Sequence, residues 1–144
     1  GGAITRALEY VAEPDQPTLI LNGDILTGVK LPLMCERLNK TSDGLILGAK
    51  VDDAATYGTL VYGADFHLKE FKEKEGKHQP GYINGGFYMF TPEVKKYFPK
   101  QENFSIEHDV FPFMKNLYVY ESDEPWIDIG VPERLAWARE YWKE

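Results

Sequence analysis

Two spacings of apolar residues divide the first third of the chain into predicted helices and strands. Residues that recur every three or four positions predict helices with one apolar face. They are Ile4, Ala7, Leu8 and Val11 before Pro14, and Leu31, Met34 and Leu38 around Pro32. Unbroken apolar runs, TLIL at 18–21 and GLILGAKV at 44–51, predict buried strands. This order of helix, strand, helix and strand predicts a parallel α/β sheet.

The remaining residues predict further strands and shorter helices. GTLVY and FHLKEFKEK flank a Gly-Ala-Asp turn at 63–65, a pattern typical of a β-hairpin. GGFYMF at 85–90 and LYVYE at 117–121 predict two more strands. Capping and turn residues favour three helix starts, at Thr91, Ser105 and Pro132. We therefore expect a mixed, mostly parallel sheet flanked by helices, in a single domain spanning residues 1–144.

Composition narrows the class of protein and its partners. The chain has 144 residues, 43% of them hydrophobic and 27% charged, as in an ordinary globular domain. A formal net charge of −7 argues against nucleic-acid binding, which depends on clustered Lys and Arg, but allows a nucleotide held through Mg²⁺. No apolar run reaches the roughly 20 residues of a membrane span, no signal-peptide pattern is present, and Cys35 is a lone cysteine. We expect a cytoplasmic protein with no membrane or nucleic-acid partner.

One carboxylate near the C-terminus lies in an unusually apolar stretch. Asp128 in WIDIGVPERL is surrounded by residues that suit a buried strand end, where an uncompensated charge is costly. Asp24 follows the TLIL run in a comparable position. Ligands in such sheets bind at the carboxyl ends of strands, so these two carboxylates can share a Mg²⁺. The alternative is structural: Asp24 caps a turn, and Asp128 accepts backbone N–H groups ahead of Pro132.

Other polar stretches carry less specific meaning. Glu73 and Lys74 lie at the end of the predicted hairpin, where charged residues are usually just solvated. GYINGG at 81–86 surrounds Asn84 with glycines, which let a ligand approach the backbone, although a tight loop explains them almost as well. His108 is expected at a helix start rather than in a catalytic role.

Seven motifs, taken in order, resemble the sugar-1-phosphate nucleotidylyltransferases. They are GGA, LNGD, YGTL, FKEK, GYINGGFYMF, SIEHDVFP and WIDIGVPERL. Among the subgroups, GGAI, INGG and SIEHDVFP are most similar to heptose-1-phosphate guanylyltransferases. The resemblance implies a Rossmann-like nucleotide-diphospho-sugar transferase fold. It also implies an enzyme that joins a nucleoside triphosphate to a sugar 1-phosphate and releases pyrophosphate, with the sugar phosphate attacking the α-phosphorus in line.

The resemblance implies a role for individual residues of these motifs. Asp24 and Asp128 would hold a Mg²⁺ that bridges the phosphates, and Lys74 would meet the phosphate of the sugar. These three residues are therefore the catalytic candidates. The implied substrate-binding residues are Gly2 beside the base, Asn22 and Gly23 of LNGD, Glu73 on the sugar hydroxyls, and Asn84 and Gly85 in the sugar pocket.

The sequence departs from the family pattern at two points. Val131 stands where the family usually has threonine, in the D-I-G-T-P stretch. Nothing matches the family's opening strand, its G-x-G-T-R-L loop and the lysine that follows. We therefore expect an N-terminally incomplete chain that is impaired in catalysis and has a sheet edge through which it can form a homo-oligomer.

Two other interpretations stay open at this point. One is a non-catalytic sugar-nucleotide-binding or regulatory module. The other is a glycosyltransferase of related fold, since NGD at a strand end loosely resembles the D-x-D of those enzymes. The released product separates the three: pyrophosphate for the nucleotidylyltransferase, nothing for the module and a nucleoside diphosphate for the glycosyltransferase.

Overall fold

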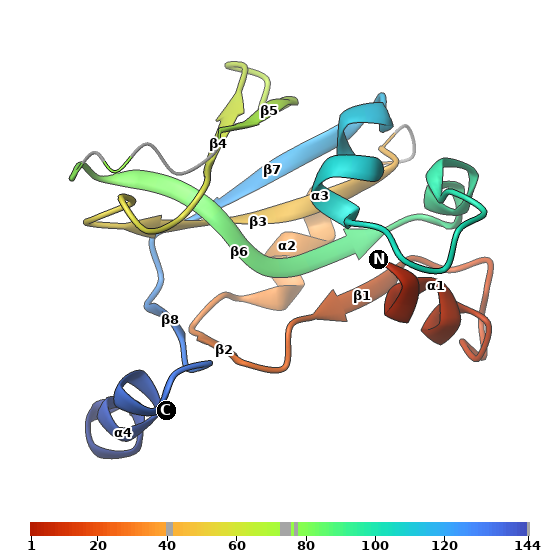
Figure 1. The fold of residues 1–144 in the computed structure, drawn as a ribbon. Helices are drawn as coiled ribbons and strands as arrows, with labels where there is room; N and C mark the ends of the chain where they lie inside the picture. Colours follow the sequence, from red (N-terminus) through yellow and green to blue (C-terminus); the bar gives the residue numbers. More distant parts are fainter. Residues whose placement is uncertain (40–41, 73–75, 77, 144) are drawn as a thin grey trace.

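A six-stranded mixed sheet forms the centre of the molecule, and a two-stranded ribbon lies beside it (Figure 1). The structure is a computed structural model that describes residues 1–39, 42–72, 76 and 78–143. The strands are β1 (Thr18–Leu21), β2 (Ile25–Thr27), β3 (Gly44–Val51), β4 (Thr59–Tyr62), β5 (Leu68–Lys72), β6 (Gly81–Phe90), β7 (Leu117–Ser122) and β8 (Trp126–Asp128). The helices are α1 (Gly2–Leu8), α2 (Leu31–Arg37), α3 (Ile106–Asp109) and α4 (Pro132–Tyr141), with 3₁₀ helices η1 (Pro92–Tyr97) and η2 (Phe111–Phe113). The expected α/β class with a mixed sheet is confirmed.

The strand neighbours differ from the expected, mostly parallel arrangement. The strand order is β5-β4-β6-β3-β7, and β1 also pairs with β6. Only β3 and β7 pair in parallel among the described strands, whereas β6 runs antiparallel to β1, β3 and β4. The strands β1 and β3 do run in the same direction, as their order in the chain predicted. Because β6 lies between them, however, both pair in an antiparallel manner.

Strand β6 is longer than expected and changes partner along its length. The sequence predicted a strand from Gly85, but the strand begins at Gly81, so the INGG stretch belongs to it rather than to a loop. Residues 87–90 pair with β1, whereas Ile83 pairs with β4. The register with β3 shifts between these two parts, and Gly86 there has a φ of 73°. A positive φ suits glycine, which explains the bend of β6 in Figure 1.

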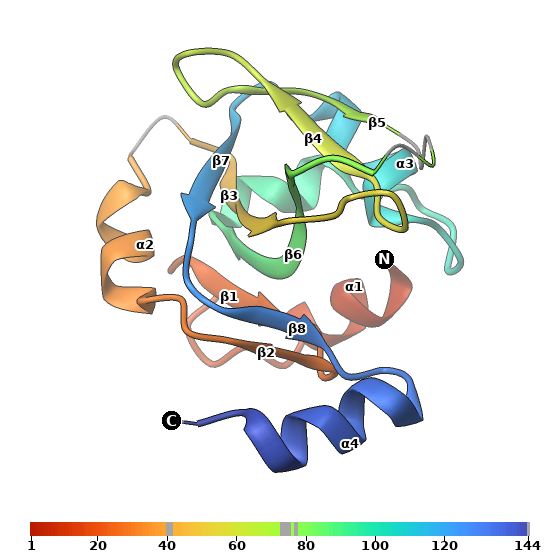
Figure 2. The same cartoon turned by 90° about the vertical axis from the view of Figure 1, so that its left-hand side faces the viewer.

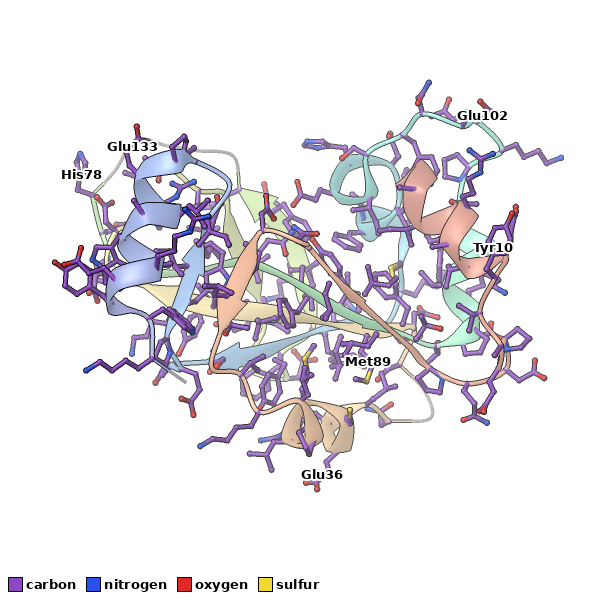
Figure 3. All side chains as sticks on the ribbon, turned by 90° about the horizontal axis from the view of Figure 1, so that it is seen from below. Tyr10, Glu36, His78, Met89, Glu102 and Glu133 are labelled. Atoms are coloured by element: carbon purple, nitrogen blue, oxygen red, sulfur yellow. The ribbon has the colours of Figure 1, made fainter. Side chains whose placement is uncertain are left out.

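Apolar side chains cover both faces of this sheet. One cluster packs β3, β6 and β7 against α3 and η2, with Ile46, Phe90 and Phe111 almost fully buried. The other packs the opposite face against α2, around Met34 and Met89. Figure 3 shows Met89 inside the molecule and Glu36 of α2 pointing away from it. The prediction of a buried first strand is wrong in degree, because β1 is only partly buried.

The ribbon of β2 and β8 lies below the main sheet and carries α4 along its outer side (Figures 1 and 2). These strands pair antiparallel, so Ile25 lies opposite Asp128 and Thr27 lies opposite Trp126. Helix α4 begins at Pro132, as predicted. In the described part of the chain, no helix combines the length and the apolar character needed to cross a membrane.

Candidate functional site

The turn after β1 brings the LNGD motif against the bend of β6. The backbone N–H of Asn22 donates to the carbonyl oxygen of Gly86 at 2.9 Å. A Cβ atom on Gly86 would lie 2.8 Å from Asn22 Nδ2, so the amide packs where a side chain would otherwise stand. Gly23 faces open space, with no atom within 4 Å of a Cβ built on it. The turn therefore fixes Asn22 at β6 and leads the chain to Asp24.

Pairing of β2 with β8 then places Asp24 beside Asp128. The register puts Ile25 opposite Asp128, and the N–H of Ile129 donates to the carbonyl oxygen of Asp24 at 2.8 Å. The indole N–H of Trp126 donates to the carbonyl oxygen of Gly85 at 3.0 Å and ties β8 to the bend of β6. Three motifs that are far apart in the sequence, LNGD, INGG and WIDIG, thus meet at one point.

The two carboxylates converge on a space that the absent side chain of Gly130 leaves open. Asp128 Oδ1 and Asp24 Oδ2 each lie 3.0 Å from the point where a Cβ atom on Gly130 would lie. Oxygen ligands from one or two carboxylates are what Mg²⁺ commonly takes from a protein, so these residues fit that cation. No group of three or more His, Cys, Asp or Glu side chains in the described residues can hold a metal ion, so two carboxylates are what the described site offers.

Asp128 has two further partners that compensate its charge. Its Oδ1 accepts the N–H of Gly130 at 2.7 Å, and its Oδ2 accepts Arg134 Nη2 at 2.8 Å. The backbone interaction is the one that the structural alternative for Asp128 predicted. The guanidinium was not predicted, and it explains how a carboxylate is tolerated in an apolar stretch.

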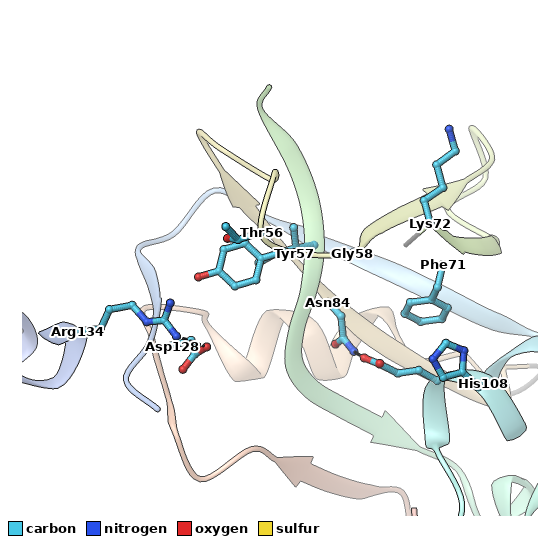
Figure 4. A pocket seen from close by; sticks show the side chains of 11 residues that line it. Thr56, Tyr57, Gly58, Phe71, Lys72, Asn84, His108, Asp128 and Arg134 are labelled. Carbon is cyan, nitrogen blue, oxygen red and sulfur yellow. Dashed lines mark hydrogen bonds and ion pairs between the residues drawn. The ribbon is translucent and has the colours of Figure 1, made fainter. Parts of the chain in front are cut away.

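A cleft of about 450 Å³ opens beside Asp128. Its lining combines aromatic, amide and charged side chains from five parts of the chain: Thr56, Tyr57, Gly58, Phe71, Lys72, Ile83, Asn84, Glu107, His108, Asp128 and Arg134. Figure 4 shows Asp128 and Arg134 at one end and Phe71, Lys72 and His108 at the other. A mainly preformed cleft with a few convergent polar groups is typical of a small-molecule site.

Asn84 is held in the middle of this cleft by a hydrogen-bond network. Its Nδ2 donates to the hydroxyl of Tyr88 at 2.9 Å and to Glu107 Oε1, and its Oδ1 accepts the N–H of Gly86. Burial raises the pKa of Tyr88 to about 12, the hydrogen bond with Asn84 lowers it in part, and the charge of Glu107 adds to the rise. Tyr88 therefore keeps its proton, and Asn84 and Glu107 keep a fixed orientation toward the cleft.

Helix α3 carries Glu107 and His108, which line the cleft, and its start is capped as expected. The hydroxyl of Ser105 accepts the N–H of His108 at 3.3 Å, and Asp109 Oδ2 accepts the N–H of Ser105 at 2.7 Å. This reciprocal arrangement satisfies backbone donors at the first turn. The predicted N-cap is confirmed.

The family model for nucleotidyl transferases matches residues 1–143. The chain belongs to this family. The predicted resemblance to sugar-1-phosphate nucleotidylyltransferases is confirmed, and several of the motifs that carried it, among them LNGD, INGG and WIDIG, meet at the cleft and the two carboxylates.

The relatives of this chain include proteins named for guanylyl transfer. It is 29% identical over 136 residues to the mannose-1-phosphate guanylyltransferase catalytic subunit beta of Drosophila pseudoobscura pseudoobscura, covering 92% of this chain and 36% of that protein. It is 36% identical over 137 residues to the D-glycero-alpha-D-manno-heptose 1-phosphate guanylyltransferase of Aneurinibacillus thermoaerophilus, covering 92% of this chain and 58% of that protein.

A solved structure supports the same relationship. HddC from Yersinia pseudotuberculosis has a TM-score of 0.84 and 31% sequence identity, covering 99% of this chain and 61% of that one. A second crystal structure of HddC, equally similar, is complexed with GMP-PN. The chain thus spans less than two thirds of the length of each of these relatives.

Some predicted site residues lie apart from the cleft or outside the described residues. A Cβ atom on Gly85 would clash with Leu47 at 2.8 Å, so this buried glycine serves close packing of β6 on β3. Gly2 lies in α1, where a Cβ atom would clash with the carbonyl oxygen of Glu102. The roles predicted for both glycines toward a ligand stay predictions. Glu73 and Lys74 lie outside the described residues, and their predicted roles are likewise untested.

Among the cleft residues that the sequence analysis did not single out are Tyr57, Glu107 and Arg134. Tyr57 belongs to the YGTL motif and contacts Trp126 edge-on, with ring centroids 5.6 Å apart. Glu107 lies in the first turn of α3, two residues after the N-cap Ser105. Arg134 follows Asp128 by six residues across a turn, a spacing that no helical or strand period connects.

Proposed function

We propose that this chain forms the metal- and sugar-binding part of an enzyme that transfers a nucleotidyl group from a nucleoside triphosphate to a sugar 1-phosphate. The products would be a nucleotide sugar and pyrophosphate. The observation that carries the proposal is the convergence of Asp24 and Asp128 on the space left by Gly130. Two converging carboxylates, one of which lines a cleft of about 450 Å³, suit a divalent cation that binds together with phosphates.

Mg²⁺ is the cation that we propose for Asp24 and Asp128, because it favours a few carboxylate oxygens together with phosphate oxygens over a complete protein cage. When bound, it would neutralise charge on the phosphates of the substrates. The side chains of Asp24, in the turn before β2, and Asp128, at the end of β8, would bind the cation together. Their relative position is fixed by the backbone pairing of β2 with β8, so little reorganisation is needed on binding.

The rest of the cleft would bind and orient the sugar. Asn84 and Glu107 supply amide and carboxylate groups that can exchange hydrogen bonds with sugar hydroxyls, and both are already oriented by contact with each other. Tyr57 adds an aromatic surface beside the same space. Holding the two reactants in line is the main contribution that a protein makes to phosphoryl and nucleotidyl transfer.

We further propose a guanine nucleotide and a manno-configured sugar 1-phosphate as the substrate class. Supporting this choice, the relatives named above are guanylyltransferases, and their names specify mannose and a manno-heptose. Lys74 keeps its predicted place opposite the phosphate of the sugar, and Glu73 keeps its place on the sugar hydroxyls, as the family resemblance implies.

The proposal is tested by binding and by product analysis. We expect the chain to bind GDP-mannose in calorimetry only with Mg²⁺ present, about 10-fold or more tightly than UDP-glucose, a difference of about 1.4 kcal/mol. We expect the full-length gene product to release pyrophosphate from GTP and mannose 1-phosphate. Release of GDP from GDP-mannose onto an acceptor would support the glycosyltransferase instead. Binding of GDP-mannose without any pyrophosphate release would support the non-catalytic module.

A further inference from the structure

One edge of the Arg134 guanidinium is only half used. The Nη2 group donates to Asp128 Oδ2 at 2.8 Å. The neighbouring Nε, which points from the same edge of the planar group, is buried and has no acceptor in the described part of the chain. An edge with two parallel donors matches an oxyanion with two oxygens, such as a carboxylate or a phosphate.

Asp128 does not complete this fork because its second oxygen is turned elsewhere. Its Oδ1 accepts the N–H of Gly130 at 2.7 Å and lies toward Asp24, on the space next to Gly130. One oxygen of Asp128 therefore contacts the Arg134 guanidinium, and the other faces the carboxylate of Asp24. A simple structural salt bridge would gain more from the two-point contact that is missing here.

The balance of charge around Asp128 depends on whether a divalent cation is bound. Without one, Asp24 and Asp128 approach each other as like charges, and Arg134 offsets one of them. A divalent cation between the carboxylates would compensate both, so Asp128 would no longer need the guanidinium. Arg134 would then keep a charge and a bidentate edge for another oxyanion.

The position of Arg134 suits such an exchange. Its side chain lines the same cleft as Asp128 and keeps 37% of its surface exposed (Figure 4). It is carried by α4, which lies on the outer side of the β2–β8 ribbon (Figure 2). Of the ten residues of this fully described helix, only Ala138 is buried, so a small shift of α4 would disturb little packing.

We propose that Arg134 is a phosphate-binding residue that Asp128 holds in place until a divalent cation takes over the carboxylate. Its Nε–Nη2 edge then binds an oxyanion of the phosphates that accompany the cation. The inference rests on the proposed function for the presence of a cation and phosphates in one site. It goes beyond that function in assigning the phosphate contact to a residue of α4.

The test uses two ligands without any turnover: Mn²⁺ alone, and inorganic pyrophosphate with saturating Mg²⁺, each titrated by calorimetry. Arg134→Gln removes the charge and the fork, and Arg134→Lys keeps the charge but loses the fork. Arg139→Gln is the matched control, because Arg139 is an exposed arginine in the last turn of the same helix. Thermal melting of each variant checks that it is folded.

We expect Arg134→Gln to bind Mn²⁺ about 3- to 10-fold more tightly than the unchanged protein, because a competing cation is gone. Arg134→Lys should stay within about 2-fold for Mn²⁺. For pyrophosphate, Arg134→Gln should bind about 10-fold more weakly and Arg134→Lys about 3-fold more weakly, as loss of a charge-assisted bidentate contact requires. Arg139→Gln should change neither affinity.

The opposite result for the metal would overturn the proposal. If Arg134 only anchors α4, Arg134→Gln will bind Mn²⁺ more weakly and melt earlier. An unchanged affinity for pyrophosphate in Arg134→Gln would also refute the phosphate contact, and so would a failure of the unchanged protein to bind Mn²⁺. If these affinities behave as expected but the full-length gene product releases no pyrophosphate from GTP, only the proposed function fails.

Discussion

Two carboxylates of this chain, Asp43 and Asp128, lie at strand ends, and each forms an ion pair with a basic side chain. Their surroundings nevertheless differ. Asp43 precedes β3 and is only 3% exposed. It accepts the hydroxyl of Tyr97 at 2.8 Å, Lys96 Nζ at 3.2 Å and the backbone N–H of Asn116 at 3.0 Å. Both of its oxygens are therefore occupied by donors from other elements.

Asp128 is more exposed and its neighbourhood is incomplete. Its side chain keeps 24% of its surface exposed, it has one backbone donor and one half-used guanidinium, and it faces another carboxylate. A buried charge with a full set of donors stabilises a fold, whereas an incomplete set beside a cleft indicates a site that a ligand completes. We therefore expect Asp43 to be an aspartate with a structural role and Asp128 to be one with a functional role.

The largest expected effect is on stability, at Asp43. Asp43→Ala would leave Tyr97, Asn116 and Lys96 without their acceptor, and should lower the free energy of unfolding by about 3 kcal/mol. For a domain of this size, that corresponds to a fall in melting temperature of about 6–12 °C. Asp128→Asn is the comparison and should cost less than about 1 kcal/mol, because its ion pair is half exposed. Urea and thermal unfolding measure both variants. Equal losses of stability in Asp43→Ala and Asp128→Asn would contradict the distinction between the two carboxylates.

The next effect is on ligand binding, where we expect the metal site of Asp24 and Asp128, rather than Asp43, to be the sensitive one. Asp24→Asn and Asp128→Asn each remove one charge with little change of shape. Each should weaken Mg²⁺-dependent binding of GDP-mannose by about 10- to 100-fold, or about 1.4–2.8 kcal/mol. Asp15→Asn, at an exposed position before β1, serves as the control. Calorimetry with Mg²⁺ titrated against all three variants decides the matter, since unchanged binding in both site variants would contradict the metal assignment.

A smaller effect is expected at the bend of β6. Gly86→Ala places a side chain at a φ of 73° and 2.8 Å from Asn22 Nδ2, so it should lower stability by about 1–2 kcal/mol and displace the turn before Asp24. Gly23→Ala meets no atom within 4 Å and should stay within about 0.5 kcal/mol. Denaturant unfolding of both variants provides the comparison, and similar losses would show that the bend of β6 does not hold the turn.

The sequence predicted the elements that local patterns determine. Strand β3 occupies the apolar run that predicted it, and the start of α4 at Pro132 and the cap at Ser105 follow from local residue preferences. The proximity of Asp24 to Asp128 was a sound hypothesis for a related reason, since each carboxylate follows an apolar run. Features that a short stretch of sequence determines by itself could therefore be predicted.

The parts that depend on distant packing could not be predicted in this way. The place of β6 between β1 and β3 is set by which strands pair, and apolar runs do not specify their neighbours. The pairing of Arg134 with Asp128 depends on a turn whose geometry no period describes. Asp43 was overlooked altogether, because its donors come from η1 and from Asn116 just before β7, more than fifty positions away.

The smallest expected effect is a change in the pH dependence of stability at Asp43. Burial alone would raise the pKa of Asp43, but hydrogen bonds from Tyr97, Lys96 and the N–H of Asn116 outweigh it and hold this pKa below its usual range. In the unfolded chain the carboxyl has an ordinary pKa of about 3.9. Asp43 therefore stabilises the fold fully above that pH, and its contribution is lost as the pH falls through the lower, folded pKa.

Asp43→Asn should make the free energy of unfolding fall less steeply at acid pH. At higher pH, its dependence on pH should run parallel to that of the unchanged protein. One proton linked to unfolding gives a slope of at most about 1.4 kcal/mol per pH unit, and that is the upper limit for the difference between the two slopes. Urea unfolding between pH 5 and about pH 3 measures it, with Asp15→Asn as the control for loss of an exposed charge. The other carboxylates contribute equally to both proteins, so they cancel in the comparison. A slope identical to that of the unchanged protein would mean that the donors around Asp43 are as well satisfied when its carboxyl group is protonated, and the contrast with Asp128 would then rest on burial alone.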